Sequence, residues 1–129
     1  MSAEENKAFI RRYFEALNRD KSPATLGQWT VDESLKRLIT SFEAAFPNYQ
    51  FAIEDLVAEG DKVAVRVTSE LEHQGELMGF PPTGKRATIS GIFLYRIADG
   101  KIVESWIQSD RLGLLQQLVL VPRPGQRGA

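Results

Sequence analysis

The spacing of apolar residues changes once along this chain, and that change constrains the fold more than any other feature. Up to about residue 46, apolar residues recur every third or fourth position, which is typical of amphipathic helices. From Gln50 onwards they recur at every second position, which is typical of strands with one buried face. Helices followed by a run of strands predict the α+β class, with N-terminal helices packed on a curved, mostly antiparallel sheet.

Two longer helices and one short one are predicted before the strands. Ser2 stands three residues before Glu5, the spacing of a capping box, and Thr30 and Glu33 repeat it. The first of these starts is followed by an apolar stripe of Phe9, Ile10, Tyr13, Phe14 and Leu17, and the second by Leu35, Leu38, Ile39, Phe42 and Phe46. Between them, Ser22-Pro23 predicts a short helical turn over residues 25–29.

Four strands and a final helix are predicted in the rest of the chain. Turns at residues 59–61 and 99–100 separate strands near 51–57, 63–71, 87–96 and 101–109. The segment 74–85 is rich in glycine and proline and is predicted to be a loop. A short apolar helix over 111–120 precedes a flexible tail at 122–129, so we expect a single domain over residues 1–121.

Composition narrows the chemistry. The 129 residues carry a formal charge of -1, which gives no field that favours nucleic acid or an anionic membrane. The absence of Cys excludes thiolate catalysis and cysteine-based metal sites, and a single His excludes a multi-histidine metal centre. The same counts lead us to expect no bound metal. No apolar run is long enough to span a bilayer, so we expect a cytoplasmic protein.

A curved sheet covered by helices forms a cone whose open end is suited to a small molecule. Strict alternation along the last strand puts Glu104, Trp106, Gln108 and Asp110 on one face together with Ile102. If that face borders the cavity, Asp110 is a candidate acid/base, because burial beside Trp106 would raise the pKa of its carboxyl. The alternative is that Asp110 only caps the helix that begins at Arg111.

His73, the single histidine, ends the second predicted strand beside the glycine-rich loop. A lone histidine near an apolar face is usually a hydrogen-bonded wall residue. The functional alternative is that His73 orients Asp110 or donates to a substrate carbonyl.

The segment from AAFPNYQFAIEDLVAEGDKVAVRVTSELEHQG through GIFLYRIADGKIVESW to SDRLGLLQQL, together with the helix NKAFIRRYFEALN, resembles the SnoaL-like polyketide cyclase (ester cyclase) family. The resemblance implies the cone of the nuclear transport factor 2-like superfamily and ring closure by intramolecular aldol condensation without a cofactor. It also implies that Asp110 is the general acid/base, and it matches His73 to a histidine of the family.

On this hypothesis the ligand is a small apolar or polycyclic carbonyl compound. His73 and Gln108 would polarise its oxygen. Its flat body would be held by Trp106, Phe93, Tyr13 and Met78.

Two other functions are left open by the sequence. One is a non-catalytic binding or dimerisation domain, with Arg66, Thr68 and Glu70 on a homodimer interface. The other is an epoxide hydrolase, in which Glu104 and Asp110 would share the cavity with Arg66.

Overall fold

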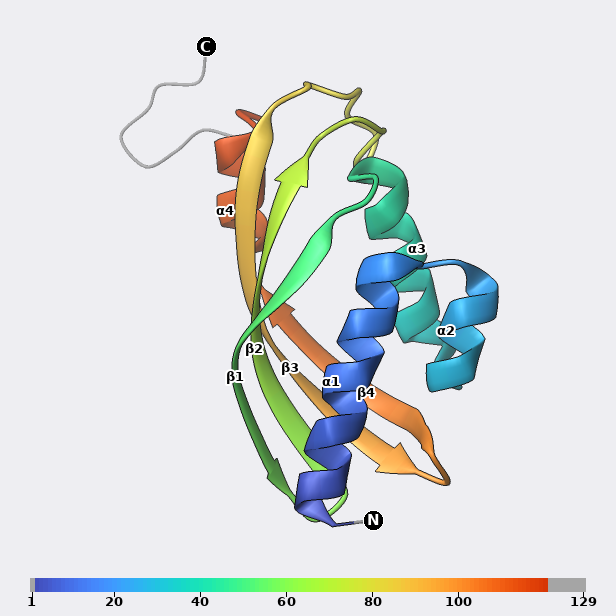
Figure 1. The fold of residues 1–129 in the computed structure, drawn as a ribbon. Helices are drawn as coiled ribbons and strands as arrows, with labels where there is room; N and C mark the ends of the chain where they lie inside the picture. Colours follow the sequence, from blue (N-terminus) through green and yellow to red (C-terminus); the bar gives the residue numbers. More distant parts are fainter. Residues whose placement is uncertain (1, 121–129) are drawn as a thin grey trace.

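A computed structural model of the protein describes residues 2–120, in which three helices are followed by four strands and a short fourth helix (Figure 1). The elements are α1 (Ala3–Arg19), α2 (Pro23–Trp29), α3 (Glu33–Ala45), β1 (Gln50–Glu59), β2 (Lys62–Glu72), β3 (Arg86–Ala98), β4 (Lys101–Ser109) and α4 (Arg111–Gln117). This order confirms the predicted α+β class.

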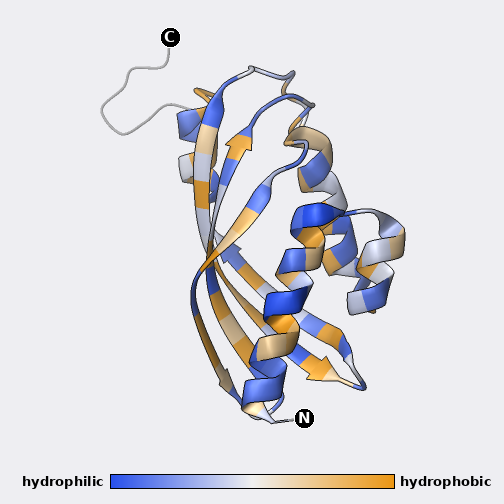
Figure 2. Cartoon of the chain, viewed as in Figure 1, coloured by the Kyte–Doolittle hydropathy of each residue, from blue (hydrophilic) through white to orange (hydrophobic). Residues whose placement is uncertain are grey.

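The four strands form one antiparallel meander in the order β1-β2-β3-β4. The strands curve strongly along their length, and α1 and α3 lie on the concave side (Figure 1). Apolar and polar residues alternate along the strands, as period-two patterning requires (Figure 2). The sheet therefore has a concave face covered by helices and a convex face that the described helices leave largely open.

The interior divides into two clusters. The larger one joins α1 and α2 to the half of the sheet near the β1–β2 and β3–β4 turns. Its fully buried members include Ile10, Tyr13, Leu17, Leu26 and Ile102. The smaller one joins the end of α3 and the buried side of α4 to the other half of the sheet, where β2 ends and β3 begins. It is formed around Phe46, Leu71, Ile89, Leu114 and Leu118. The candidate site lies where the two clusters meet.

Details at the element ends differ from the predictions. The N-cap of α3 is Asp32 rather than Thr30, because the Thr30 hydroxyl donates to the carbonyl of Ile102 at 2.9 Å and ties the chain to β4. Helix α4 is shorter than predicted and ends at Gln117. The predicted tail, 122–129, lies outside the described residues. Within residues 2–120, no helix has the length and apolar character that crossing a membrane requires.

Candidate functional site

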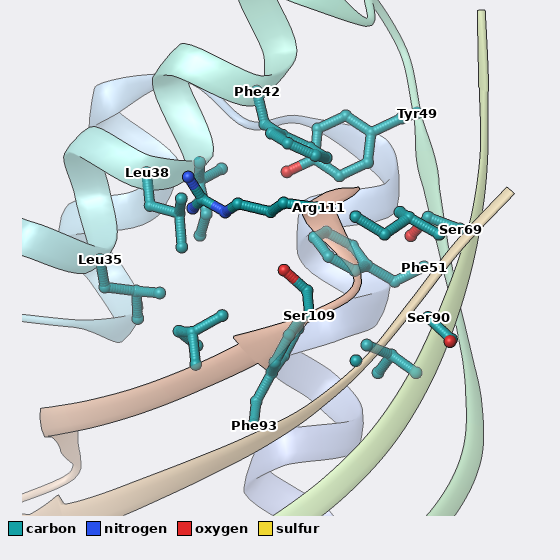
Figure 3. Close-up of a pocket in the computed structure, with 15 residues that line it drawn as sticks. Leu35, Leu38, Phe42, Tyr49, Phe51, Ser69, Ser90, Phe93, Ser109 and Arg111 are labelled. Atoms are coloured by element: carbon teal, nitrogen blue, oxygen red, sulfur yellow. The ribbon is translucent and has the colours of Figure 1, made fainter. Parts of the chain in front are cut away.

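A mostly apolar cavity lies between α3 and the concave face of the sheet (Figure 3). Helix α3 and the first residues of β1 form one wall, and β2, β3 and β4 form the other. Its lining comprises Leu35, Leu38, Ile39, Phe42, Tyr49, Phe51, Val67, Ser69, Ile89, Ser90, Gly91, Phe93, Ile107, Ser109 and Arg111. We call this space the inner cavity.

The N-cap of α3 fixes the position of the cavity wall that this helix forms. The carboxylate of Asp32 accepts hydrogen bonds from the backbone N–H groups of Ser34 and Leu35, as an N-cap does. Its other oxygen accepts from the hydroxyl of Ser105 on β4 at 2.7 Å. Burial raises the pKa of Asp32, but the hydrogen bonds from Ser34, Ser105 and the backbone outweigh burial, and the net shift is downward. The ionised Asp32 therefore joins the start of α3 to the sheet edge beside the cavity.

Five of the lining residues have polar side chains: Tyr49, Ser69, Ser90, Ser109 and Arg111. Ser109 directs its hydroxyl toward the middle of the cavity, and Tyr49 reaches over it toward Phe42 (Figure 3). Arg111 extends across the opening toward α3, and its guanidinium lies near Leu38 (Figure 3). No ion pair with another residue of the described chain holds this guanidinium. An unpaired cation at an apolar cavity is positioned to meet a negatively charged oxygen.

Tyr49 is held from behind by a charged pair. The ammonium of Lys21 lies 4.6 Å from the centroid of the Tyr49 ring and 3.6 Å from a carboxylate oxygen of Glu43. Burial, and secondly the charge of Glu43, raise the pKa of Tyr49 above its usual range. The Tyr49 hydroxyl therefore keeps its proton at neutral pH and can act as a donor.

The cavity is narrow. Its empty volume is about 550 Å³ when the open mouth is included, but only about 50 Å³ admits the centre of a water-sized molecule. The inner cavity in this conformation suits a flat group between its two walls. A polycyclic body would require the side chains of α3 to move.

The structure separates the residues predicted to hold the ligand. Phe93 lines the inner cavity. Tyr13 is fully buried in the larger core cluster, edge-on to Tyr95 at 5.9 Å, and does not line it. Met78 lies in a neighbouring groove.

The prediction that Trp106 and Gln108 lie on a buried face is wrong. Ile97 on β3 pairs with Ile102, but the preceding residue, Arg96, pairs with Glu104, so Val103 is an extra residue on β4. A bulge of this kind reverses the faces of all later residues relative to strict alternation. Ile102 stays buried, whereas Trp106 is 45% exposed on the convex face.

Asp110 follows the same reversal. Its carboxylate is exposed and accepts a hydrogen bond from the backbone N–H of Gly113 at 2.8 Å. The alternative that this residue caps the last helix is therefore confirmed. The expected burial of its carboxylate beside Trp106 is wrong, because both side chains are exposed. Its immediate neighbours in the chain, Ser109 and Arg111, do line the cavity.

His73 is fully buried outside the cavity lining. Its Nδ1 accepts from the backbone N–H of Thr83 at 3.2 Å and lies 3.0 Å from the Thr83 hydroxyl. Its ring packs against Phe46 with the centroids 5.6 Å apart. In this arrangement His73 fastens the glycine-rich loop to the end of β2, as the wall-residue alternative predicts, and it is not paired with Asp110.

The carboxylate pair needed for an epoxide hydrolase is not assembled. Glu104 forms an ion pair with Arg96, and both Glu104 and Arg66 lie on the convex face, outside the inner cavity. The expectation that Glu104 and Asp110 share the cavity with Arg66 is therefore wrong.

The sequence-based predictions missed the polar residues that line the cavity: Tyr49, Ser69, Ser90, Ser109 and Arg111. One signal was available for Arg111. A cation in the first turn of a helix faces the positive end of the helix dipole, which is unfavourable. An arginine at that position is more readily explained by a contact outside the helix.

Comparison with known proteins agrees with this architecture. The sequence matches the family described as SnoaL-like polyketide cyclase over residues 4–118. No curated protein matches it.

Solved structures give closely similar folds. AclR from Streptomyces galilaeus, described as "a putative hydroxylase", is 30% identical, with a TM-score of 0.83 over 95% of this chain and 85% of that one. IdmH from Streptomyces antibioticus, described as "a putative polyketide cyclase", is 27% identical, with a TM-score of 0.74 over 88% of this chain and 98% of that one. A SnoaL-like protein from Jannaschia is 18% identical with a TM-score of 0.79 over 93% of this chain and 95% of that one, a likeness of fold alone.

Proposed function

Because the chain belongs to the SnoaL-like polyketide cyclase family, we propose that it closes a ring in a small, flat carbonyl compound bound in the inner cavity. The observation that carries the proposal is Arg111, which lines a mostly apolar cavity and forms no ion pair with any residue among 2–120. In an aldol closure, a base removes a proton beside one carbonyl, and the resulting enolate carbon bonds to the carbon of a second carbonyl. The second oxygen becomes an alkoxide and then takes up a proton.

Arg111 acts in this proposal on the oxygens that become negative. A fixed cation beside an enolate or alkoxide stabilises the transition state more than the neutral substrate. The neighbouring hydroxyls of Ser109 and Tyr49 would donate further hydrogen bonds to the same oxygens. The narrow space between α3 and the sheet would hold the two reacting carbons together, which lowers the entropic part of the barrier.

Asp110 is the proposed proton carrier. Support comes from the family resemblance and from its position between two cavity residues, Ser109 and Arg111. Its exposed carboxylate does not line the inner cavity, so in this proposal the proton passes between Asp110 and the substrate through water.

A suitable test substrate is an aryl methyl δ-diketone, whose aldol closure and loss of water produce a conjugated aryl cyclohexenone that is followed by absorbance. Replacing Arg111 by Gln should lower the rate constant about a hundredfold, the usual effect of losing one group that stabilises an oxyanion. The control is Arg37→Gln, which removes an exposed arginine of α3 that does not line the cavity. Equal rates in the Arg111 variant and the wild type would contradict the proposal.

A specific observation favours a second function, binding without turnover. Among the residues that the structure describes, the lining of the inner cavity includes no Asp, Glu or His, and so no ordinary general base. If the protein is a binding module, the diketone will bind in an Arg111-dependent way but will cyclise no faster than in buffer.

The open convex face supports a homodimer. Val57, Ala64, Leu94 and Trp106 are paired across all four strands and form an apolar row on this face. The next row contains Asp55, Arg66, Ile92 and Gln108. We propose that a second copy of the chain covers the apolar row, since a two-fold axis would match each row with a like surface.

A further inference from the structure

A second hollow, the outer groove, adjoins the inner cavity. It lies between α3, the loop after β2, and α4, and is lined by Leu38, Ser41, Phe42, Glu76, Leu77, Met78, Arg111, Leu114 and Leu115. Leu38, Phe42 and Arg111 line both spaces. These three side chains therefore form the partition between a narrow inner space and a wider outer one.

The two spaces differ in size in a way that bears on the substrate. About 310 Å³ of the outer groove admits the centre of a water-sized molecule, against about 50 Å³ of the inner cavity. A ligand whose charged oxygen meets Arg111 has room for one flat group inside the partition and for a longer group outside it.

Met78 is held at the groove in an unusual conformation. Leu77 and Phe80 exchange backbone hydrogen bonds at 3.0 and 2.8 Å, which closes a two-residue turn over Met78 and Gly79. Both turn residues have positive φ, 50° for Met78 and 85° for Gly79. Turns of this type favour Asn or Gly at the Met78 position, and a methionine there is strained. The Met78 side chain is also 69% exposed, so burial in the chain's own core does not explain it.

The charge at the rim restricts what the groove accepts. Glu76 is an exposed carboxylate of the lining, and the rest of the lining is apolar except for Ser41 and Arg111. An anionic group at the far end of a ligand would be repelled by Glu76, whereas an alkyl chain would cover Leu77, Met78 and Leu115.

We propose that the outer groove binds the apolar tail of the same substrate, which is an elongated molecule with an enolisable carbonyl pair between a flat group and an uncharged alkyl chain. This inference rests on the proposed function, because it takes Arg111 as the anchor of the carbonyl oxygens. It adds the substrate class and assigns Met78 as a residue that sets chain-length specificity.

The probes are aryl alkyl β-diketones with alkyl groups from methyl to hexyl. These compounds do not cyclise, and their enolates absorb at longer wavelength than the neutral forms. Arg111 should lower the pKa of the bound diketone, so an enolate band should appear at neutral pH with the wild type and be lost in Arg111→Gln. Each methylene that the groove buries should raise affinity about fourfold.

Met78→Asn tests the groove without endangering the fold, because Asn tolerates positive φ better than Met. We expect unchanged affinity for the methyl probe and a roughly tenfold smaller gain between the methyl and hexyl probes. The matched control is Leu112→Asn, which changes a 60% exposed apolar residue of α4 that lines neither space. It should keep the full gain.

The outcomes separate the two proposals. Arg111-dependent binding of the methyl probe with no gain on lengthening the chain would overturn the outer-groove inference and leave the proposed function standing. Absence of any Arg111-dependent binding would overturn both. No chain-length gain in the full chain, together with a gain that appears after deletion of residues 121–129, would assign the groove to the chain's own last residues and overturn the inference.

Discussion

The carboxylate of Asp110 accepts a hydrogen bond from the backbone N–H of Gly113 at 2.8 Å, and this contact begins α4. A side chain on residue 113 would collide with the same carboxylate. Asp110 is thus committed to capping the helix whose first residue, Arg111, lines the inner cavity. Two different functions for Asp110, capping and proton transfer, can be separated by substitution.

Asp110→Asn should preserve the cap and remove the acid/base group. Asn caps a helix about as well as Asp, so the free energy of unfolding should change by less than about 0.5 kcal/mol, whereas Asp110→Ala should lose about 1 kcal/mol. If Asp110 carries the proton, cyclisation of the diketone should fall about a hundredfold in both variants. Urea denaturation and absorbance kinetics measure the two effects. Wild-type turnover in Asp110→Asn would assign the residue to capping alone.

Gly75→Ala should destabilise the fold by about 1–3 kcal/mol. The backbone N–H of Gly75 donates to the carbonyl of Ala45 at 3.0 Å, and an added methyl group would meet the carbonyl oxygen of Ala44, which is backbone and cannot rotate away. The control is Gly27→Ala in α2, where the added methyl group meets nothing and helix propensity improves. Urea midpoints that fall equally in both variants would contradict the close approach at Gly75.

Stability should decrease above about pH 10, and Tyr13→Phe should make the decrease smaller. Burial raises the pKa of Tyr13 and of Tyr95 above the usual tyrosine value of 10.0. The unfolded chain therefore loses these protons at a lower pH than the folded chain, which favours unfolding as pH rises through that range. The measurement is the urea midpoint from about pH 9 to about pH 11, which spans the usual titration range of tyrosine. Equal slopes in the two proteins would mean that Tyr13 is not protected from ionisation.

Trp106→Glu should prevent self-association if the convex face is a homodimer interface. A carboxylate in the apolar row would have to be desolvated against its own copy across the two-fold axis, which is strongly unfavourable. Sedimentation velocity should give a dimer for the wild type and a monomer for this variant. Leu112→Glu, which changes an exposed apolar residue of α4, should stay dimeric. A monomeric wild type would refute the interface directly.

Much of the architecture follows from local patterns. The stripe from Phe9 to Leu17 is the buried face of α1, and the alternation of Val63, Val65 and Val67 is the buried face of β2. The capping box at Ser2 and Glu5 starts α1 as predicted. These features depend on residues close together in the sequence, so period and capping chemistry are sufficient to predict them.

The site depended on contacts between distant residues. The extra residue at Val103 is defined by how β4 pairs with β3, and it decides that Ser109 rather than Trp106 faces the cavity. The apolar wall is α3, held in place through the hydrogen bond between Ser105 and Asp32. Helical and strand periods were legible in the sequence because they arise from backbone geometry within one element. The cavity and its cation arise from the register between strands and the packing of a helix across them, and only the tertiary structure decides these.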